Sequence, residues 1–312
     1  MKNRSVLCIG GCVIDRVGET VDAKERLHTS NIGHMRSSLG GVARNVAENL
    51  ARLGIPVSLL SRVGDDPEGE RVIAASSRAG IDMAGVVRDS QAATASYTAI
   101  FNGEGELVIG LADMGVFEAI TPETAIEALA TAAADAVLFT DANLQPATLR
   151  AIAKAKGGRM LASVPVSIQK LARLTSILGD LDILFLNLHE ARALLGSEDD
   201  AESLAHRLAR GPVRRGLLTL GPRGALAWAD GKVTAIPALA SSPVNVNGAG
   251  DALAGATLAR LAVGDDFIPA ARRAMAAAAL TVESPHTVRA DLTMSALLAR
   301  YALSQPTETI IP

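Results

Sequence analysis

The chain has 312 residues, of which 49% are hydrophobic and 20% charged, with a formal net charge of −3 and a pI near 6.0. This composition excludes a disordered chain and is typical of one large α/β domain or two small ones. The weakly acidic charge provides no basic surface for nucleic acid. No apolar run reaches the roughly 18 residues of a membrane span, and no signal-peptide pattern follows Met1, so we expect a cytoplasmic protein.

Short apolar runs alternate with helical patterns through most of the chain. The predicted strands are 6–9, 57–60, 136–139, 160–164, 183–186 and 217–220. Val42, Val46, Leu50 and Leu53 recur at helical spacing, and Gly54 ends that pattern. Such alternation predicts a single α/β domain over 1–312, with a mostly parallel sheet covered by helices on both faces.

Two segments break this alternation. Residues 13–37 are too polar and irregular for a core unit, and β-like runs at 97–101 and 106–111 flank the turn 102–105 (NGEG). We expect segments at approximately 13–37 and 95–113 to form a small sheet that stands off the main domain. The alternative is a hairpin that decorates the edge of the main sheet. Residues 304–312 are expected to fray.

Polar candidates follow the first strand, where active sites of open α/β sheets lie. Asp15 offers a carboxylate that can accept hydrogen bonds from vicinal sugar hydroxyls. Gly40 and Gly41 permit close approach of the backbone, and Asn45 on the next helical turn supplies both a donor and an acceptor. The structural alternatives are a turn residue for Asp15 and a helix cap for Asn45. The two cysteines, Cys8 and Cys12, are expected to be reduced core thiols.

Two further motifs follow later strands. Asn187 and Glu190 share a face if a helix starts there, and an amide with a carboxylate suits a Mg²⁺ ion that keeps most of its waters. Taken alone, the same pair is typical of a helix start. Thr219, Gly221 and Gly224 form a TxGxxG loop at the end of the next predicted strand.

The run 245–251 (NVNGAGD) opens an apolar helical stretch. The N–H groups of Gly248, Ala249 and Gly250 lie at the positive end of that helix and make a seat for an anion. Asp251 holds a carboxylate beside this seat, as phosphoryl transfer needs when a proton must leave the attacking hydroxyl. The alternative is an ordinary glycine turn with Asp251 as the helix cap.

The ordered set of motifs resembles the ribokinase-like (pfkB) carbohydrate kinases, and within them the pseudouridine-kinase subgroup. The resemblance extends from residue 6 to about residue 292. It rests on 29–31 (TSN), 40–54 (GGVARNVAENLARLG), 141–143 (DAN), 187–190 (NLHE), 219–224 (TLGPRG) and 248–251 (GAGD). It implies a three-layer α/β/α fold whose small β-sheet is a lid over the acceptor site and the contact of a homodimer.

The resemblance also implies a reaction, in which ATP and Mg²⁺ phosphorylate pseudouridine to pseudouridine 5′-phosphate by direct in-line transfer. Asp251 is then the base, and the loop 248–250 is the anion hole. The implied ribose contacts are Asp15, Gly41 and Asn45, and Gly40 and Arg44 are further substrate-binding candidates. Ser30 and Asn31 are the candidates for contact with the nucleobase, and the alternative for Thr29, Ser30 and Asn31 is a plain polar loop. The implied nucleotide contacts are Asn187, Thr219, Gly221 and Gly224, with Glu190 reaching Mg²⁺ through water.

Some positions depart from the family pattern. Asn247 stands where the family usually has Thr, and Leu253 stands where Phe is common. Asn245 and Asn247 are candidate ligands for a monovalent cation such as K⁺. The rival functions are another ribokinase-like kinase acting on ribose, fructose, uridine or another nucleoside, and an inactive nucleotide-binding regulator. A nicotinamide-dependent dehydrogenase is disfavoured because Leu253 falls at the third glycine of GxGxxG.

Overall fold

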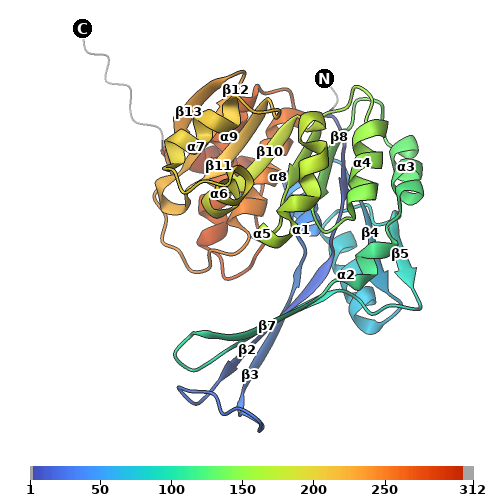
Figure 1. Ribbon diagram of the computed structural model, residues 1–312, viewed down its shortest axis with the longest axis vertical. Coiled ribbons are helices and arrows are strands. Elements are labelled where there is room, and N and C mark those ends of the chain that lie inside the picture. The colour runs from blue at the N-terminus through green and yellow to red at the C-terminus, as the bar shows by residue number, and fades with distance from the viewer. Residues whose placement is uncertain (1–2, 305–312) are drawn as a thin grey trace.

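The computed structural model describes residues 3–304 and contains one large sheet with a small sheet projecting from it (Figure 1). The large sheet has nine strands in the order β13-β12-β11-β10-β9-β8-β1-β4-β5. Neighbouring strands from β11 to β5 are parallel, and β12 and β13 are added antiparallel at one edge. The strands are β1 (Val6–Ile9), β4 (Val57–Gly64), β5 (Val86–Asp89), β8 (Val137–Asp141), β9 (Leu161–Val164), β10 (Ile183–Asn187), β11 (Arg215–Thr219), β12 (Ala225–Ala229) and β13 (Lys232–Ile236).

All six predicted strands are confirmed within a few residues, while β5, β12 and β13 were not predicted. β12 (ALAWA) is rich in alanine and β13 (KVTAI) begins with a lysine, so neither has the continuous β-branched run that gives a strong sequence signal. The expected fraying of 304–312 falls, from residue 305 onward, outside the described residues.

Helices cover both faces of the large sheet, as predicted. Alternate side chains of β1 show the division: Val6 and Cys8 belong to one core, and Leu7 and Ile9 to the other. The first core includes α1 (Val42–Arg52), α2 (Pro67–Arg78), α8 (Ala249–Ala262), α9 (Phe267–Val282) and α10 (Met294–Leu303). The second includes α3 (Pro122–Thr131), α4 (Pro146–Ala155), α5 (Ile168–Leu171), α6 (Leu188–Leu195) and α7 (Ala201–Ala209).

The small sheet consists of the two segments that break the alternation. Its strands are β2 (Val13–Thr20), β3 (Gly33–Gly40), β6 (Ser96–Phe101) and β7 (Leu107–Asp113), in the order β3-β2-β6-β7. It extends well beyond the main domain (Figure 1), so the edge-hairpin alternative is wrong. Because β2 follows β1 directly and β3 leads into α1, the base of this sheet lies at the carboxyl edge of the large sheet.

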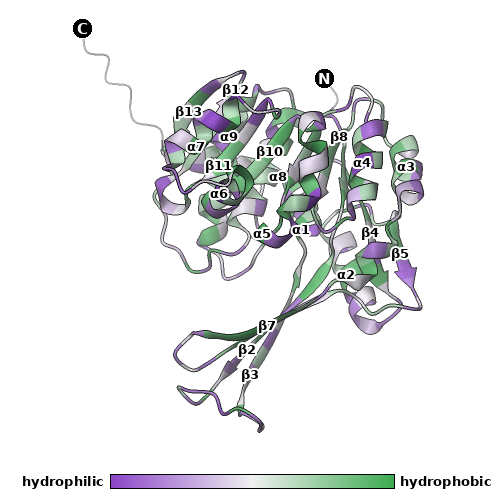
Figure 2. Cartoon of the chain, in the orientation of Figure 1, coloured by the Kyte–Doolittle hydropathy of each residue, from purple (hydrophilic) through white to green (hydrophobic). Residues whose placement is uncertain are grey.

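Hydrophobic residues concentrate in the strands of the large sheet, and purple polar stretches mark the outer helix faces (Figure 2). No helix within 3–304 is long and apolar enough to cross a membrane. Cys8 and Cys12 are buried free thiols, as expected, and burial is the main cause that raises the pKa of Cys12 to about 11.

Candidate active site

The carboxyl edge of the large sheet brings Asp251 and Asn45 into contact. Asn45 lies in the first turn of α1, and Asp251 lies in the first turn of α8, the helix that packs against it. The Nδ2 group of Asn45 donates a hydrogen bond to Oδ2 of Asp251 at 2.8 Å. Two residues that the sequence indicated separately, 206 positions apart, therefore form one unit.

The enclosed position of Asp251 raises the pKa of its carboxyl group to about 7. Burial is the largest cause, and the negative charge of Asp141 adds to it. The hydrogen bond from Asn45 and the positive charge of Arg44 act in the opposite direction. A carboxylate with a pKa near neutrality is suited to accept a proton, because general bases work best when their pKa lies near the operating pH.

Arg44 connects this pair to the rest of α1. Its Nη1 group donates to Oδ1 of Asn45 at 2.8 Å and to the carbonyl of Leu39 at 3.3 Å. The guanidinium group also pairs with Glu48 one turn further along the helix. Arg44 is only 4% exposed, and burial lowers its pKa to about 10. In this structure Arg44 therefore holds the side-chain oxygen of Asn45.

Asp15 lies on β2 at the base of the small sheet and faces Gly40. A Cβ atom on Gly40 would come within 2.0 Å of Oδ2 of Asp15, so only glycine leaves room for this carboxylate. Burial raises the pKa of Asp15 to about 6, while Arg44 opposes the shift. Asp15 and Asn45 are therefore not the simple turn residue and cap of the structural alternatives.

Asp141 is a buried carboxylate that the sequence motifs did not single out for a role. It ends β8 and accepts hydrogen bonds from the backbone N–H groups of Gly11 (3.0 Å), Ala43 (3.0 Å) and Asn143 (2.9 Å). Burial raises its pKa in spite of these bonds. Asp141 thus fixes the glycine loop after β1 and the start of α1, which carries Asn45. A charged residue at the end of a continuously apolar strand was the signal that could have identified it.

The glycine loop at the start of α8 has the predicted form. Gly248 is the N-terminal cap with φ 81°, and a Cβ atom there would lie 1.9 Å from the carbonyl oxygen of Thr287. At Gly250, by contrast, no described atom beyond its chain neighbours and the backbone of its own helix lies within 4 Å of a Cβ position, so space is open beside the helix start. The N–H group of Ala249 makes only a long contact of 3.5 Å to Val246. The N–H groups at the start of α8 can bind an anion in that space.

Asn187 and Glu190 form a capping box at the start of α6. Oδ1 of Asn187 accepts from the N–H group of Glu190, and Oε2 of Glu190 accepts from the N–H group of Asn187, both at 2.9 Å. The helix-start interpretation is therefore correct for the pair. Burial raises the pKa of Glu190, and its second carboxylate oxygen has no hydrogen bond within the described structure. Thr219 ends the neighbouring strand and donates to the carbonyl of Leu186 at 3.3 Å.

Two groups of predicted residues lie apart from this cluster. Ser30 and Asn31 are exposed in the loop between β2 and β3, at the far end of the small sheet (Figure 1). The side chain of Asn31 bonds there to the backbone of Arg26. Asn245 and Asn247 precede α8, but Oδ1 of Asn245 already accepts from the N–H group of Asn247 at 3.0 Å, and Asn247 is exposed.

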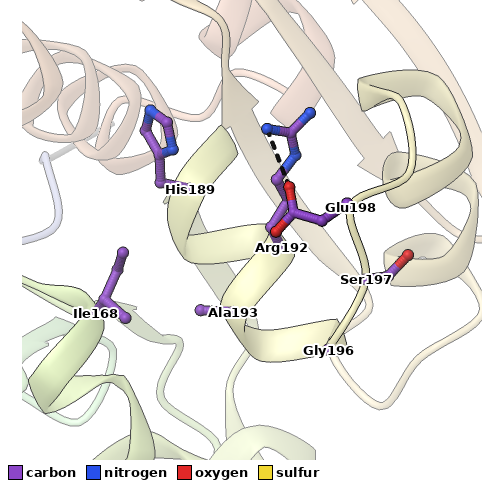
Figure 3. A pocket seen from close by; sticks show the side chains of 7 residues that line it. All are labelled: Ile168, His189, Arg192, Ala193, Gly196, Ser197 and Glu198. Atoms are coloured by element: carbon purple, nitrogen blue, oxygen red, sulfur yellow. Dashed lines mark ion pairs between the residues drawn. The ribbon is translucent and has the colours of Figure 1, made fainter.

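A cavity of about 380 Å³ opens between α5 and α6, beside the Asn187–Glu190 pair. Its lining residues are Ile168, His189, Arg192, Ala193, Gly196, Ser197 and Glu198 (Figure 3). Arg192 pairs with Glu198 across one side of it at 3.4 Å. None of the predicted ribose-binding residues lines this cavity.

An open α/β sheet with a carboxylate and an amide-lined helix start at its carboxyl edge is suited to bind phosphate groups. A family model described as pfkB family carbohydrate kinase matches residues 3–293, and the chain belongs to this family. Kinases of the family are phosphotransferases that act on hydroxyl groups and use ATP. The resemblance inferred from the motifs is confirmed.

Individual relatives agree with this assignment. The pseudouridine kinase of Escherichia coli is 26% identical over 300 residues, which cover 94% of this chain and 95% of that protein. A solved carbohydrate kinase from Agrobacterium tumefaciens is 34% identical and aligns with a TM-score of 0.83, covering 96% of this chain and 98% of its own. A ribokinase of Arabidopsis thaliana, solved with ribose and ATP, has the same fold, with a TM-score of 0.83 and 20% identity over 96% of this chain and 99% of its own.

Proposed function

We propose that this chain transfers the γ-phosphoryl group of ATP to the 5′-hydroxyl of pseudouridine. The observation that carries the proposal is the contact of Asp251 with Asn45, beside the open helix start of α8. This contact places a proton acceptor, a polar group that can bind the sugar and an anion-binding site next to one another. The similarity to a pseudouridine kinase along nearly the whole chain supports the choice of acceptor.

The proposed mechanism follows from these groups. Asp15 and Asn45 hold the ribose hydroxyls, and Asp251 takes the proton of the 5′-hydroxyl as its oxygen attacks the γ-phosphorus in line. The N–H groups of Gly248, Ala249 and Gly250 stabilise the charge that develops on the phosphoryl oxygens. The new O–P bond forms as the bond to the β-phosphate oxygen breaks, and ADP leaves. Thr219, Gly221 and Gly224 lie along the nucleotide in this proposal.

The residues present also fit a magnesium ion held mainly by water and phosphate. The second carboxylate oxygen of Glu190 is a hard oxygen donor without a hydrogen-bond partner among residues 3–304, while the backbone N–H group of Asn187 fixes the first. When bound, Mg²⁺ would neutralise negative charge on the phosphates. A K⁺ site at Asn245 and Asn247 stays a prediction, and a comparison of rates in K⁺ and in Na⁺ tests it.

The choice of nucleobase is expected to depend on one hydrogen bond. Pseudouridine has a ring N–H donor where uridine has a C–H, so an acceptor opposite that position would be left unpaired by uridine. Such a loss costs about 1–3 kcal/mol, which corresponds to roughly 5- to 150-fold in kcat/KM, and we expect at least roughly tenfold. Because Ser30 and Asn31 lie at the far end of the small sheet, they reach a base only if this sheet closes or if a second copy of the chain presents them.

A panel of nucleosides and sugars with Mg²⁺-ATP, read by ADP release, tests the proposed function. We expect pseudouridine to exceed uridine, ribose and fructose in kcat/KM, with the margin over uridine at least roughly tenfold. A preference for a free sugar would change the assigned acceptor but leave the proposed kinase reaction in place. Absence of turnover with every acceptor would support the inactive-regulator alternative.

The small sheet is proposed to be a lid that also joins two copies of the chain. Met35, Ile109 and Leu111 are 60%, 59% and 67% exposed. The strand register places them on one face, together with Ile100, because Gly18 pairs with both Met35 and Ile100, and Ile100 pairs with Ile109. An exposed apolar face of this kind is typical of a protein interface.

A further inference from the structure

Lys170 is a cation at the carboxyl edge of the sheet that the proposed mechanism does not use. It lies on α5, directly after β9. In the sheet, β9 stands between β8, which ends at Asp141, and β10, which ends at Asn187. Lys170 therefore follows the strand that separates the Asp141 part of the proposed site from the part that carries Asn187.

The side chain of Lys170 is held in place by its neighbours. Its Nζ group donates to Oδ1 of Asn143. Asn143 packs against the glycine loop after β1, since a Cβ atom on Gly11 would lie 2.6 Å from the Nδ2 atom of Asn143. Arg173 fixes the same segment by donating to the carbonyls of Asn143 at 2.8 Å and Ala142 at 3.3 Å. Lys170 thus differs from a freely moving surface lysine.

The ammonium group of Lys170 lacks a charged partner among the described residues. It has three donors, and Asn143 is a neutral acceptor for one of them. Lys156, in contrast, pairs with Asp182 at 2.7 Å. Partial burial lowers the pKa of Lys170, Arg173 acts in the same direction, and Asp141 opposes them. A half-buried cation with free donors is stabilised when an oxyanion binds to it.

The backbone that leads to Lys170 is strained. Val166 has φ 67°, a left-handed conformation that is unfavourable for a β-branched residue. Among the described residues, the other non-glycine positions with positive φ are His28 and Asp230, which are not β-branched. Ser167 then accepts a hydrogen bond from the N–H group of Lys170 at 3.3 Å. Strain of this kind persists where the surroundings fix a conformation, and it is frequent at ligand sites.

The geometry points to Lys170 as an oxyanion-binding residue of the phosphoryl-transfer site, an inference that rests on the proposed function. Asp251 and the loop 248–250 at the start of α8 lie on one face of the sheet, and Lys170 on α5 approaches this site from the other face. The oxyanion is the terminal phosphoryl group of the nucleotide or, should the acceptor differ from the uncharged pseudouridine, an acid group on that acceptor. In either case, the positive charge of Lys170 binds it opposite the start of α8.

Equilibrium binding tests this inference without turnover. Calorimetry is used to compare Mg²⁺-ADP with the Mg²⁺ complex of the β,γ-imido analogue of ATP, for the wild type, Lys170→Gln, Lys170→Arg and Lys154→Gln. Lys154 is exposed on α4 and serves as the matched control. We expect Lys170→Gln to lower the affinity for the analogue by roughly 10- to 100-fold and the affinity for ADP by less than about threefold. Lys170→Arg should keep most of the affinity, and Lys154→Gln should match the wild type.

A second arm identifies the source of the oxyanion. If Lys170→Gln lowers the affinity for ribose 1-phosphate but not the affinity for ribose or for the ATP analogue, the oxyanion belongs to the acceptor. Wild-type affinity of Lys170→Gln for every ligand would overturn the inference, and so would equal losses for ADP and the analogue. A wild type that binds neither nucleotide would overturn the proposed function as well, so the two failures are distinguishable. Unchanged thermal unfolding confirms that each variant is folded.

Discussion

At the scale of single residues, the contact between Asn45 and Asp251 is the feature on which the proposed chemistry depends. The sequence motifs indicated both residues, but they could not indicate that the two side chains touch. The reason is physical: the contact depends on how α1 packs against α8, and local patterns carry no information on that packing. Asp141 illustrates the same limit, since its partners are backbone N–H groups from three separate segments.

Replacement of Asp251 by Asn should abolish most of the turnover. The substitution keeps the shape of the side chain but removes the proton acceptor, so we expect kcat to fall by roughly 10²–10⁴ with little change in ATP affinity. Steady-state kinetics and nucleotide binding measure the two quantities separately. A variant that keeps wild-type kcat would refute the role of Asp251 as the base.

The raised pKa of Asp251 also predicts how activity depends on pH. The base must be ionised, so kcat/KM of the wild type should fall as the pH drops below about 7. Asp15, with a pKa near 6, should steepen the fall at lower pH. A pH profile that stays flat down to pH 5 would contradict these assignments.

The same pKa predicts a gain of stability in Asp251→Asn. Folding raises the pKa of this carboxyl group from 3.8 to about 7, so between these values the folded protein holds more protons than the unfolded chain. Stability from this group is therefore greatest below about pH 3.8 and is lost as the pH rises toward 7. Asp251→Asn should exceed the wild type in Tm at pH 8, with a smaller difference at pH 5. Thermal unfolding at both pH values measures this, and an equal or lower Tm at pH 8 would contradict it.

At the scale of elements, the start of α6 shows how one pair of residues can serve both structure and chemistry. The capping box explains why Asn187 and Glu190 are three positions apart, and the second oxygen of Glu190 is the group that we propose for Mg²⁺. The sequence allowed both interpretations, because the same spacing satisfies both. The structure confirms the cap and leaves the metal as a prediction.

Two substitutions of Glu190 separate these roles. Gln at this position keeps the capping box, so Glu190→Gln should retain its Tm but need more Mg²⁺ for the half-maximal rate. Ala removes the cap and should in addition destabilise the protein by about 1 kcal/mol. Magnesium titrations of the rate, with thermal unfolding of both variants, provide the comparison. If Glu190→Gln has the magnesium dependence of the wild type, Glu190 is only a cap.

At the scale of the whole molecule, the sequence predicted the layered α/β domain and the separate small sheet, because hydrophobic periodicity and turn residues are local signals. It did not predict the position of Ser30 and Asn31. Motif similarity suggested a contact for these residues, but their location follows from the length of β2 and β3, which carry the loop away from Asp251.

Association through the small sheet can be tested by placing a charge on its apolar face. Ile109→Asp would place a carboxylate in the proposed interface, so we expect the wild type to sediment as a dimer and the variant as a monomer. Ile126→Asp is the matched control, since Ile126 is a 46% exposed apolar residue on α3, away from this sheet. A wild type that is monomeric at micromolar concentration, or a dimeric Ile109→Asp, would contradict the proposal.

The 206-residue separation of Asn45 and Asp251 also has a consequence for synthesis of the protein. On the ribosome, β1 and α1 emerge long before α8, and contacts between such distant segments form late because the intervening chain must first be ordered. The base and its amide partner therefore meet only when most of the domain has been made. A nascent chain that already contains α1 would have no competent catalytic group, so an unfinished molecule is expected to consume no ATP.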